Sequence, residues 1–247
     1  MTDLPRATAA SPADSAETDR VRQRYARRDA QADAARYSLL NPATLAEQQE
    51  RVRAIARGLR RLGWVDASAL RITEVGCGSG GNLLDWLRLG ATAAQLTGIE
   101  LLPERVRAAQ AVLPPEVTLH LGDATQAPVP AASQDVVLQA TVFSSLLDDA
   151  FQARLAQAMW HWLKPGGVVL WYDFTVNNPR NPDVRGVPLR RVRELFPQAA
   201  HLHAERLTLA PPLARAVTRL HPGLYSAFNL VPLLRTHVLA WIEKPVR

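Results

Sequence analysis

The fold is decided by one stretch of the chain, Glu74-Val75-Gly76-Cys77-Gly78-Ser79-Gly80-Gly81-Asn82-Leu83. The apolar run before it predicts a strand over residues 70–75, and the pattern after it predicts a helix over 82–89. Glycines between them allow positive φ angles and a close approach of a ligand to the backbone. The first N–H groups of the helix would suit an anionic group. The stretch therefore indicates a nucleotide-type site, but its glycines also satisfy G-x-G-x-x-G, so it does not choose the nucleotide.

Strands and helices alternate on both sides of this turn. Strands are predicted at residues 95–100, 117–121, 135–140 and 167–173, and helices at 103–113 and 150–163. Two more strands, 201–209 and 236–243, follow with short helices at 187–196 and 211–220. This alternation predicts an α/β fold with a mostly parallel, doubly wound sheet covered on both faces.

The residues before the sheet differ in character. Residues 1–18 are rich in Ala, Ser, Pro and Asp, which predicts a disordered leader. Helices are expected at 19–40 and 43–62, separated by Asn41-Pro42. The length suits one domain over residues 19–247, with a helical part at 19–64 and a core at 70–247.

Composition narrows the function classes. The net charge is +6, and the arginines that supply it are scattered, which favours a general arginine bias over a nucleic-acid surface. No apolar run is long enough for a membrane span, and the start lacks a secretory pattern. The single cysteine, Cys77, forms no internal disulfide, so a cytoplasmic setting is expected. The histidines lack metal-ligand spacing, so no metal is predicted.

Acidic residues end three successive strands. Glu74 lies two residues before the first glycine, where a carboxylate would suit an ammonium group and would repel a phosphate. Glu100 lies at the distance of a ribose-binding acid, about 20 residues on. Asp123, followed by Ala124, could accept from an adenine amino group. Ligands of open parallel sheets bind at this edge, so the three acids predict one site.

The segments EVGCGSGGNL, LTGIELLPERV, GDA, DVVLQATVF and LKPGGVV resemble, in order, the motifs of class I S-adenosylmethionine-dependent methyltransferases. The resemblance covers residues 71–173. It implies a Rossmann-like seven-stranded sheet with an antiparallel last strand, N-terminal helices that form a lid, S-adenosyl-L-methionine as cofactor and S-adenosyl-L-homocysteine as product.

The resemblance also implies roles for particular residues. Glu74 with the glycines Gly76, Gly78 and Gly80 would hold the methionine end, and Glu100 the ribose. The remaining cofactor contacts would come from Leu101, Asp123, Ala124, Gln139 and Thr141, the last two near the sulfonium.

Acceptor residues are less well defined. The tract from Trp171 to Val187 is similar to tracts in bacterial methyltransferases of small-molecule or envelope-glycan pathways. Its polar side chains suit acceptor binding, or they satisfy the turns of a proline-pinned loop. The candidates for acceptor binding are Asn177, Asn178 and Arg180 in this tract and Tyr25 and Tyr37 in the lid.

Two further features bear on the reaction. Asp173 is the candidate base, although methyl transfer to an acceptor without a proton to lose needs none. The apolar stretch 221–234 would suit an acceptor pocket, a homodimer face or a plain core layer.

Several alternatives stay open at this point. A nicotinamide-dependent oxidoreductase shares the glycine pattern, and a cofactor-binding protein without activity would keep the same motifs. A non-methylating reaction, such as cyclisation of the cofactor's own arm, has the same signature. Amino-methylating enzymes of DNA show D/N-P-P-aromatic where this chain has Gln139-Ala140-Thr141-Val142, so a small-molecule acceptor is favoured over nucleic acid.

Overall fold

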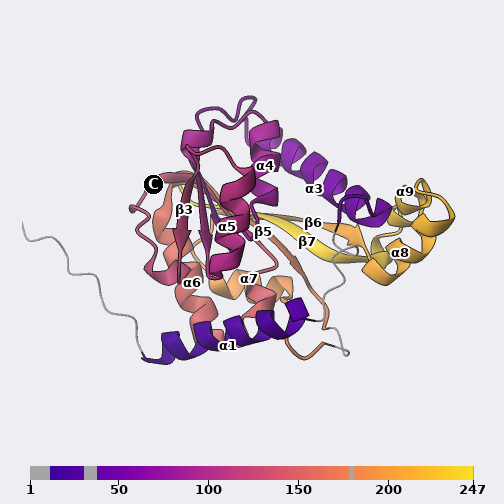
Figure 1. Ribbon diagram of the computed structural model, residues 1–247. Helices are drawn as coiled ribbons and strands as arrows, with labels where there is room; N and C mark the ends of the chain where they lie inside the picture. The colour runs from indigo at the N-terminus through magenta and orange to yellow at the C-terminus, as the bar shows by residue number, and fades with distance from the viewer. Residues whose placement is uncertain (1–11, 31–37, 178–180, 247) are drawn as a thin grey trace, which may run out of the picture.

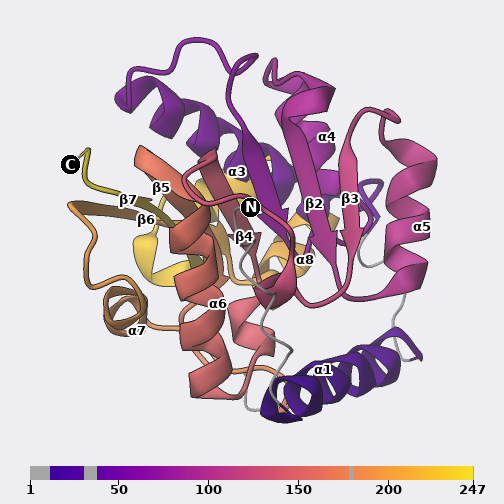
Figure 2. The ribbon, with the colours of Figure 1, turned by 90° about the vertical axis from the view of Figure 1, so that its left-hand side faces the viewer.

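The computed structural model describes residues 12–30, 38–177 and 181–246 of the chain. Its centre is a seven-stranded sheet in the order β3-β2-β1-β4-β5-β7-β6, shown in Figures 1 and 2. The strands are β1 (Ile72–Val75), β2 (Leu96–Glu100), β3 (Thr118–Leu121), β4 (Gln134–Ala140), β5 (Leu163–Phe174), β6 (His201–Leu209) and β7 (Arg235–Glu243). Among the described strands, β7 alone runs opposite to the other six, which confirms the predicted fold.

Helices cover both faces of the sheet. The first face carries α3 (Pro42–Arg61), α4 (Gly81–Arg88) and α5 (Pro103–Val112), whose apolar residues share one core with the sheet. The second face carries α6 (Asp149–Trp162) and α7 (Leu189–Leu195) over a separate core. Helices α8 (Pro211–Leu220) and α9 (Leu224–Asn229) connect β6 to β7 and project from the end of the sheet (Figure 1).

Helix α1 (Pro12–Ala30) begins inside the segment that was predicted to be a disordered leader. Glu17 and Arg24 form a buried ion pair of 2.6 Å, and Arg24 also donates to the backbone oxygen of Ser145 at 3.0 Å. A buried charge needs such partners, and residues this far apart in sequence meet only in the folded chain. The sequence predicts a helix over 19–40, but residues 38–40 form a turn instead. Residues 31–37 lie outside the described part.

The order of the strands places a crevice between β1 and β4. From β1 the chain proceeds to β2 and β3 on one side and then returns to β4 on the other. Connections leave the carboxyl ends of β1 and β4 in opposite directions, so those ends form the switch point where open α/β sheets bind ligands. Helix α1 lies across this edge in Figures 1 and 2. Within the described residues, no helix combines the length and apolar character needed to cross a membrane.

Close packing joins α3 to the sheet at Gly58. A Cβ atom at this position would lie 2.2 Å from the Cε2 and Cζ2 atoms of Trp241, a side chain with 0% exposure. The indole is enclosed on all sides, so it cannot move away cheaply.

We expect Gly58→Ala to lower the free energy of unfolding by about 1–3 kcal/mol, because overpacking outweighs the higher helix propensity of alanine. Chemical denaturation measures the change. Gly81→Ala is the matched control, since Gly81 is also helical, is exposed and has no atom within 4 Å of the added Cβ. Equal stability of the two variants would contradict the packing argument.

Candidate active site

A cavity opens at the switch point, between the carboxyl ends of the strands and helix α1. Its walls come from the turn after β1, the ends of β2 and β3, the turn after β4 and the start of α6. The structure brings seven of the predicted residues to this cavity: Tyr25, Gly76, Glu100, Leu101, Asp123, Ala124 and Thr141. The sequence-based site is therefore assembled, although not every predicted member lines it.

The glycine turn needs glycine at specific positions. Gly76 and Gly78 have φ angles of +66° and +54°, in the left-handed region. A Cβ on Gly76 would also meet Val142 Cγ2 at 2.5 Å. The N–H groups of Gly76 and Cys77 donate to the backbone oxygen of Ile99 at 2.8 and 3.1 Å, which holds the turn against β2. Gly78 and Gly80 shape the turn and do not line the cavity.

Glu100 ends β2 and faces the cavity with a fixed carboxylate. Its Oε2 accepts the Gly78 N–H at 2.8 Å, and its Oε1 accepts the Leu102 N–H at 2.9 Å. Each carboxylate oxygen can accept a second hydrogen bond. The group is thus oriented by the backbone and retains acceptor capacity for a pair of vicinal hydroxyls.

Asp123 ends β3 in a similar way. Its Oδ1 accepts from the N–H and the hydroxyl of Thr125, at 2.8 and 2.9 Å, which forms the start of the short helical turn Ala124–Gln126. This anchors one carboxylate oxygen and leaves the other with acceptor capacity at the wall of the cavity. An exocyclic amino group is a suitable donor for it.

Glu74 is completely buried at the end of β1. Its Oε1 accepts from Asn82 Nδ2 at 2.6 Å, and Asn82 Oδ1 accepts from Arg51 Nη2 at 3.0 Å. Its Oε2 has no partner among the described residues. Burial raises the pKa of Glu74 to about 8, against the opposing effect of the Asn82 hydrogen bond. Like Gln139 and Asp173, Glu74 does not line the cavity, but its orphaned carboxylate oxygen is an acceptor that an ammonium group would satisfy.

Two polar members that the sequence did not reveal are Arg51 and Asn82, which lie beside Glu74. Asn82 follows the glycines directly, which could have marked it. Arg51 lies on α3 among other scattered arginines, and no local pattern distinguishes it. It reaches the site only because α3 packs beside the start of α4.

The turn after β4 is strained and braced. Thr141 has a φ angle of +58°, which is rare for a β-branched residue and often marks functional sites. Gln139 is buried and does not line the cavity. Its Oε1 accepts the Val142 N–H at 3.0 Å and its Nε2 donates to the Tyr172 oxygen at 3.3 Å, so it supports the turn instead of touching a ligand.

Helix α1 closes the cavity from the outer side. Tyr25 lines it together with Thr18 and Val21. The Tyr25 hydroxyl lies 3.3 Å from Ser145 Oγ, and the Arg105 guanidinium stacks over its ring at 4.4 Å. Tyr37 lies outside the described residues, so its role stays a prediction.

The tract after β5 supports the lid. Arg27 of α1 pairs with Asp183 at 2.7 Å. Asn177 Oδ1 accepts the Gly186 N–H at 2.9 Å, so this side chain satisfies the tract's own turn, as the alternative interpretation of the loop expects. Asn178 and Arg180 lie outside the described residues.

Asp173 occupies the interior of the protein and does not line the cavity. Its Oδ2 accepts the Ser144 N–H at 3.1 Å and its Oδ1 accepts the Phe174 N–H at 3.0 Å. Burial raises its pKa to about 7. The geometry favours a role in tying the turn after β4 to β5 over the predicted role as a base, because a base must reach its acceptor. Among the described residues, no three His, Cys, Asp or Glu side chains are grouped as metal ligands.

Solved structures with this fold are numerous. An S-adenosylmethionine-dependent methyltransferase from Mesorhizobium loti is 16% identical, with 76% of this chain and 96% of that chain covered and a TM-score of 0.56. A putative sarcosine dimethylglycine methyltransferase from Galdieria sulphuraria is also 16% identical, with 79% of this chain and 86% of that chain covered and a TM-score of 0.57. Geranyl diphosphate C-methyltransferase from Streptomyces coelicolor A3(2) is 15% identical, with 79% of this chain and 77% of that chain covered and a TM-score of 0.55. At these identities the likeness shows the fold alone.

The sequence itself matches one family model. Residues 72–167, which contain the glycine turn, the three acids and the first residues of β5, match the model of the methyltransferase domain. No curated protein matches the chain in sequence. The matched segment, the sheet order with its antiparallel β7 and the carboxylates at the strand ends agree: residues 72–167 carry a class I S-adenosylmethionine-dependent methyltransferase domain.

Proposed function

We propose that this enzyme transfers the methyl group of S-adenosylmethionine to a small-molecule acceptor held under helix α1. The observation that carries the proposal is the set of three carboxylates at the ends of successive strands, Glu74, Glu100 and Asp123. The three carboxylates have different surroundings, and each one suits a different part of the cofactor. The buried Glu74 suits an ammonium, the backbone-anchored Glu100 suits ribose hydroxyls, and Asp123 suits the adenine amino group.

The protein's contribution to the reaction is orientation. S-Adenosylmethionine supplies an electrophilic methyl group on its sulfonium. The rigid turns after β1 and β4 would fix the position of that group, and orientation of this kind is worth roughly 7–11 kcal/mol of a barrier. Helix α1, held by the hydrogen bonds of Arg24 to the Ser145 oxygen and of the Leu147 N–H to Glu17 and by the Arg27–Asp183 ion pair, would exclude water from the cavity. No proton transfer by Asp173 is required.

A small acceptor agrees with the enclosure of the cavity. Val21 and Tyr25 of α1 lie over it and Phe151 and Leu155 of α6 line it, which leaves a partly apolar chamber. Fold neighbours include enzymes whose names specify sarcosine dimethylglycine and geranyl diphosphate, so this architecture accommodates small acceptors of contrasting polarity. A cytoplasmic location is part of the proposal.

The ribose assignment predicts the effect of Glu100→Gln. We expect this variant to bind S-adenosylhomocysteine about 10- to 150-fold more weakly, because charge-assisted hydrogen bonds contribute roughly 1.5–3 kcal/mol. Binding of 5′-methylthioadenosine, which retains the ribose, should weaken as much. Calorimetric titration measures both affinities. Glu116→Gln is the control, since Glu116 is exposed and does not line the cavity. Unchanged affinity in Glu100→Gln would refute the assignment.

The methionine-end assignment predicts a different pattern for Glu74→Gln. This variant should lose affinity for S-adenosylhomocysteine by at least tenfold and keep its affinity for 5′-methylthioadenosine, which has no ammonium group. The same titrations give both values. Equal losses for the two ligands would place Glu74 elsewhere in the site or show a general structural defect.

The raised pKa of Glu74 predicts a pH dependence. The ionised carboxylate is the form that pairs with an ammonium, and its population falls as the pH drops below about 8. Affinity for S-adenosylhomocysteine should therefore decrease from pH 8 to pH 6, by up to about tenfold per pH unit. The 5′-methylthioadenosine affinity should vary less. Titrations of the native protein and Glu74→Gln across this range test it, and parallel profiles for the two proteins would contradict it.

A further inference from the structure

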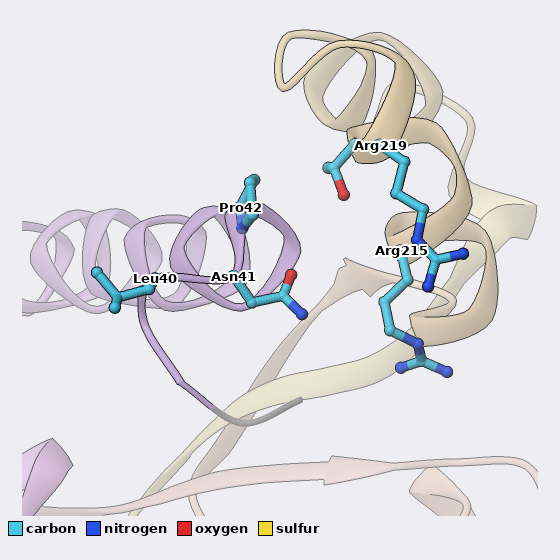
Figure 3. A pocket seen from close by; sticks show the side chains of 6 residues that line it. Leu40, Asn41, Pro42, Arg215 and Arg219 are labelled. Atoms are coloured by element: carbon cyan, nitrogen blue, oxygen red, sulfur yellow. The ribbon is translucent and has the colours of Figure 1, made fainter. Parts of the chain in front are cut away.

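A second cavity lies between the start of α3 and helix α8, away from the carboxylates of the methyltransferase site. It has a volume of about 520 Å³, within the range of ligand pockets. Its lining consists of Leu40, Asn41, Pro42, Arg215, Thr218 and Arg219, and none of these residues is acidic. Figure 3 shows both arginine side chains extending in the same direction from α8, opposite the first residues of α3.

Packing fixes helix α8, which carries the two arginines, against the start of α3. Ala214 and Val217 of α8 are buried in an apolar cluster with Ala43, at the start of α3. Arg215 and Arg219 are four residues apart on α8, so they are neighbours on one face of the helix, where like charges repel each other. The fold therefore holds two cations close together and directs them at a cavity.

The start of α3 adds positive potential to the same space. This helix has 20 residues, and its N-terminus carries a partial positive charge of about half a unit. Asn41 already accepts the Ala43 N–H through Oδ1 at 3.0 Å, and Pro42 has no N–H. Hydrogen bonds to a ligand would therefore come from the guanidinium groups, whose forked donors match the oxygens of a phosphate.

Negative charge near this cavity is scarce. The chain contains no Asp or Glu between Glu205 and Glu243, a segment that includes all of α8 and α9. The positive charge of Arg215 lowers the pKa of Glu47 on α3, but burial raises that pKa by more. Arg51 influences Glu47 more strongly than Arg215 does, so one carboxylate is shared between them. Two arginines and no acidic residue line the cavity.

We propose that the cavity between α3 and α8 is a binding site for a phosphate-type oxyanion, recognised by Arg215 and Arg219. Pro42, at this site, and Arg51, beside Glu74, are nine residues apart on helix α3, which corresponds to roughly 14 Å along the helix. The inference does not depend on the cofactor, and its test uses phosphate probes alone.

The oxyanion can belong to a soluble molecule or to a lipid headgroup, and the surface nearby makes the second source worth testing. Leu220, Leu230 and Leu233, in the same acid-free segment, have exposures of 82%, 76% and 86%. Exposed leucines beside arginines are typical of surfaces that contact anionic lipids.

The test compares the native protein with the double variant Arg215→Gln/Arg219→Gln. Arg190→Gln/Arg193→Gln is the matched control, because it removes two exposed arginines from α7 and changes the net charge equally. Titration with inorganic pyrophosphate at constant ionic strength gives the affinity. Sedimentation with vesicles of phosphatidylglycerol, and of phosphatidylcholine as the uncharged reference, gives the lipid affinity. Thermal unfolding of each variant checks that it is folded.

We expect at least a tenfold loss of one of these affinities in the double variant and less than a twofold change in the control. Loss of pyrophosphate binding identifies a soluble ligand, and loss of phosphatidylglycerol binding alone identifies a lipid headgroup. Arg219 lies in the last turn of α8, where a cation stabilises the partial negative charge of the helix end. If this is its whole role, the double variant will unfold at a lower temperature with unchanged affinities for both probes, which overturns the proposal. Absence of binding to both probes in the native protein overturns it as well.

Discussion

The turn between β1 and α4 depends on the end of β2. The Ile99 oxygen accepts the Gly76 and Cys77 N–H groups, and the Glu100 carboxylate accepts the Gly78 N–H, so one strand end holds three successive residues of the turn. Left-handed φ angles at Gly76 and Gly78 make this arrangement possible. One carboxylate thus orders the glycine turn and also lines the cavity, so the shape of the turn is coupled to the shape of the cavity wall.

Polar groups buried around the site have divided roles. Gln139 and Asp173 satisfy backbone N–H groups at the turn after β4, which keeps the strained Thr141 in place. Glu74 is different, because one of its oxygens has no partner in the described part of the chain, and Asn82, itself bonded to Arg51, satisfies only the other oxygen. Leaving a buried acceptor unsatisfied is costly, and a native structure tolerates this mainly where a ligand completes the contact.

Helix α3 connects the arginine-lined cavity to the carboxylate site. Its first residues border the arginine-lined cavity beside α8, and Arg51 in its middle supports Asn82 at the carboxylate site. Glu50, between these points, accepts from Thr208, Tyr225 and Asn229, which fixes α9 and β6 against the same helix. Packing of Gly58 on Trp241 then sets how closely α3 approaches the sheet.

The sequence by itself determined the alternation of strands and helices, the glycine turn and the three acids at successive strand ends, because periodicity and backbone requirements are local properties. The sheet order and its antiparallel β7 followed from the family resemblance. Only the tertiary structure decided that α1 begins at Pro12, that Asp173 is enclosed away from the cavity and that Arg51 reaches the site. It alone brought Arg215 and Arg219 to the start of α3. Burial and charge pairing arise between residues distant in sequence, and a linear pattern does not record which of them meet.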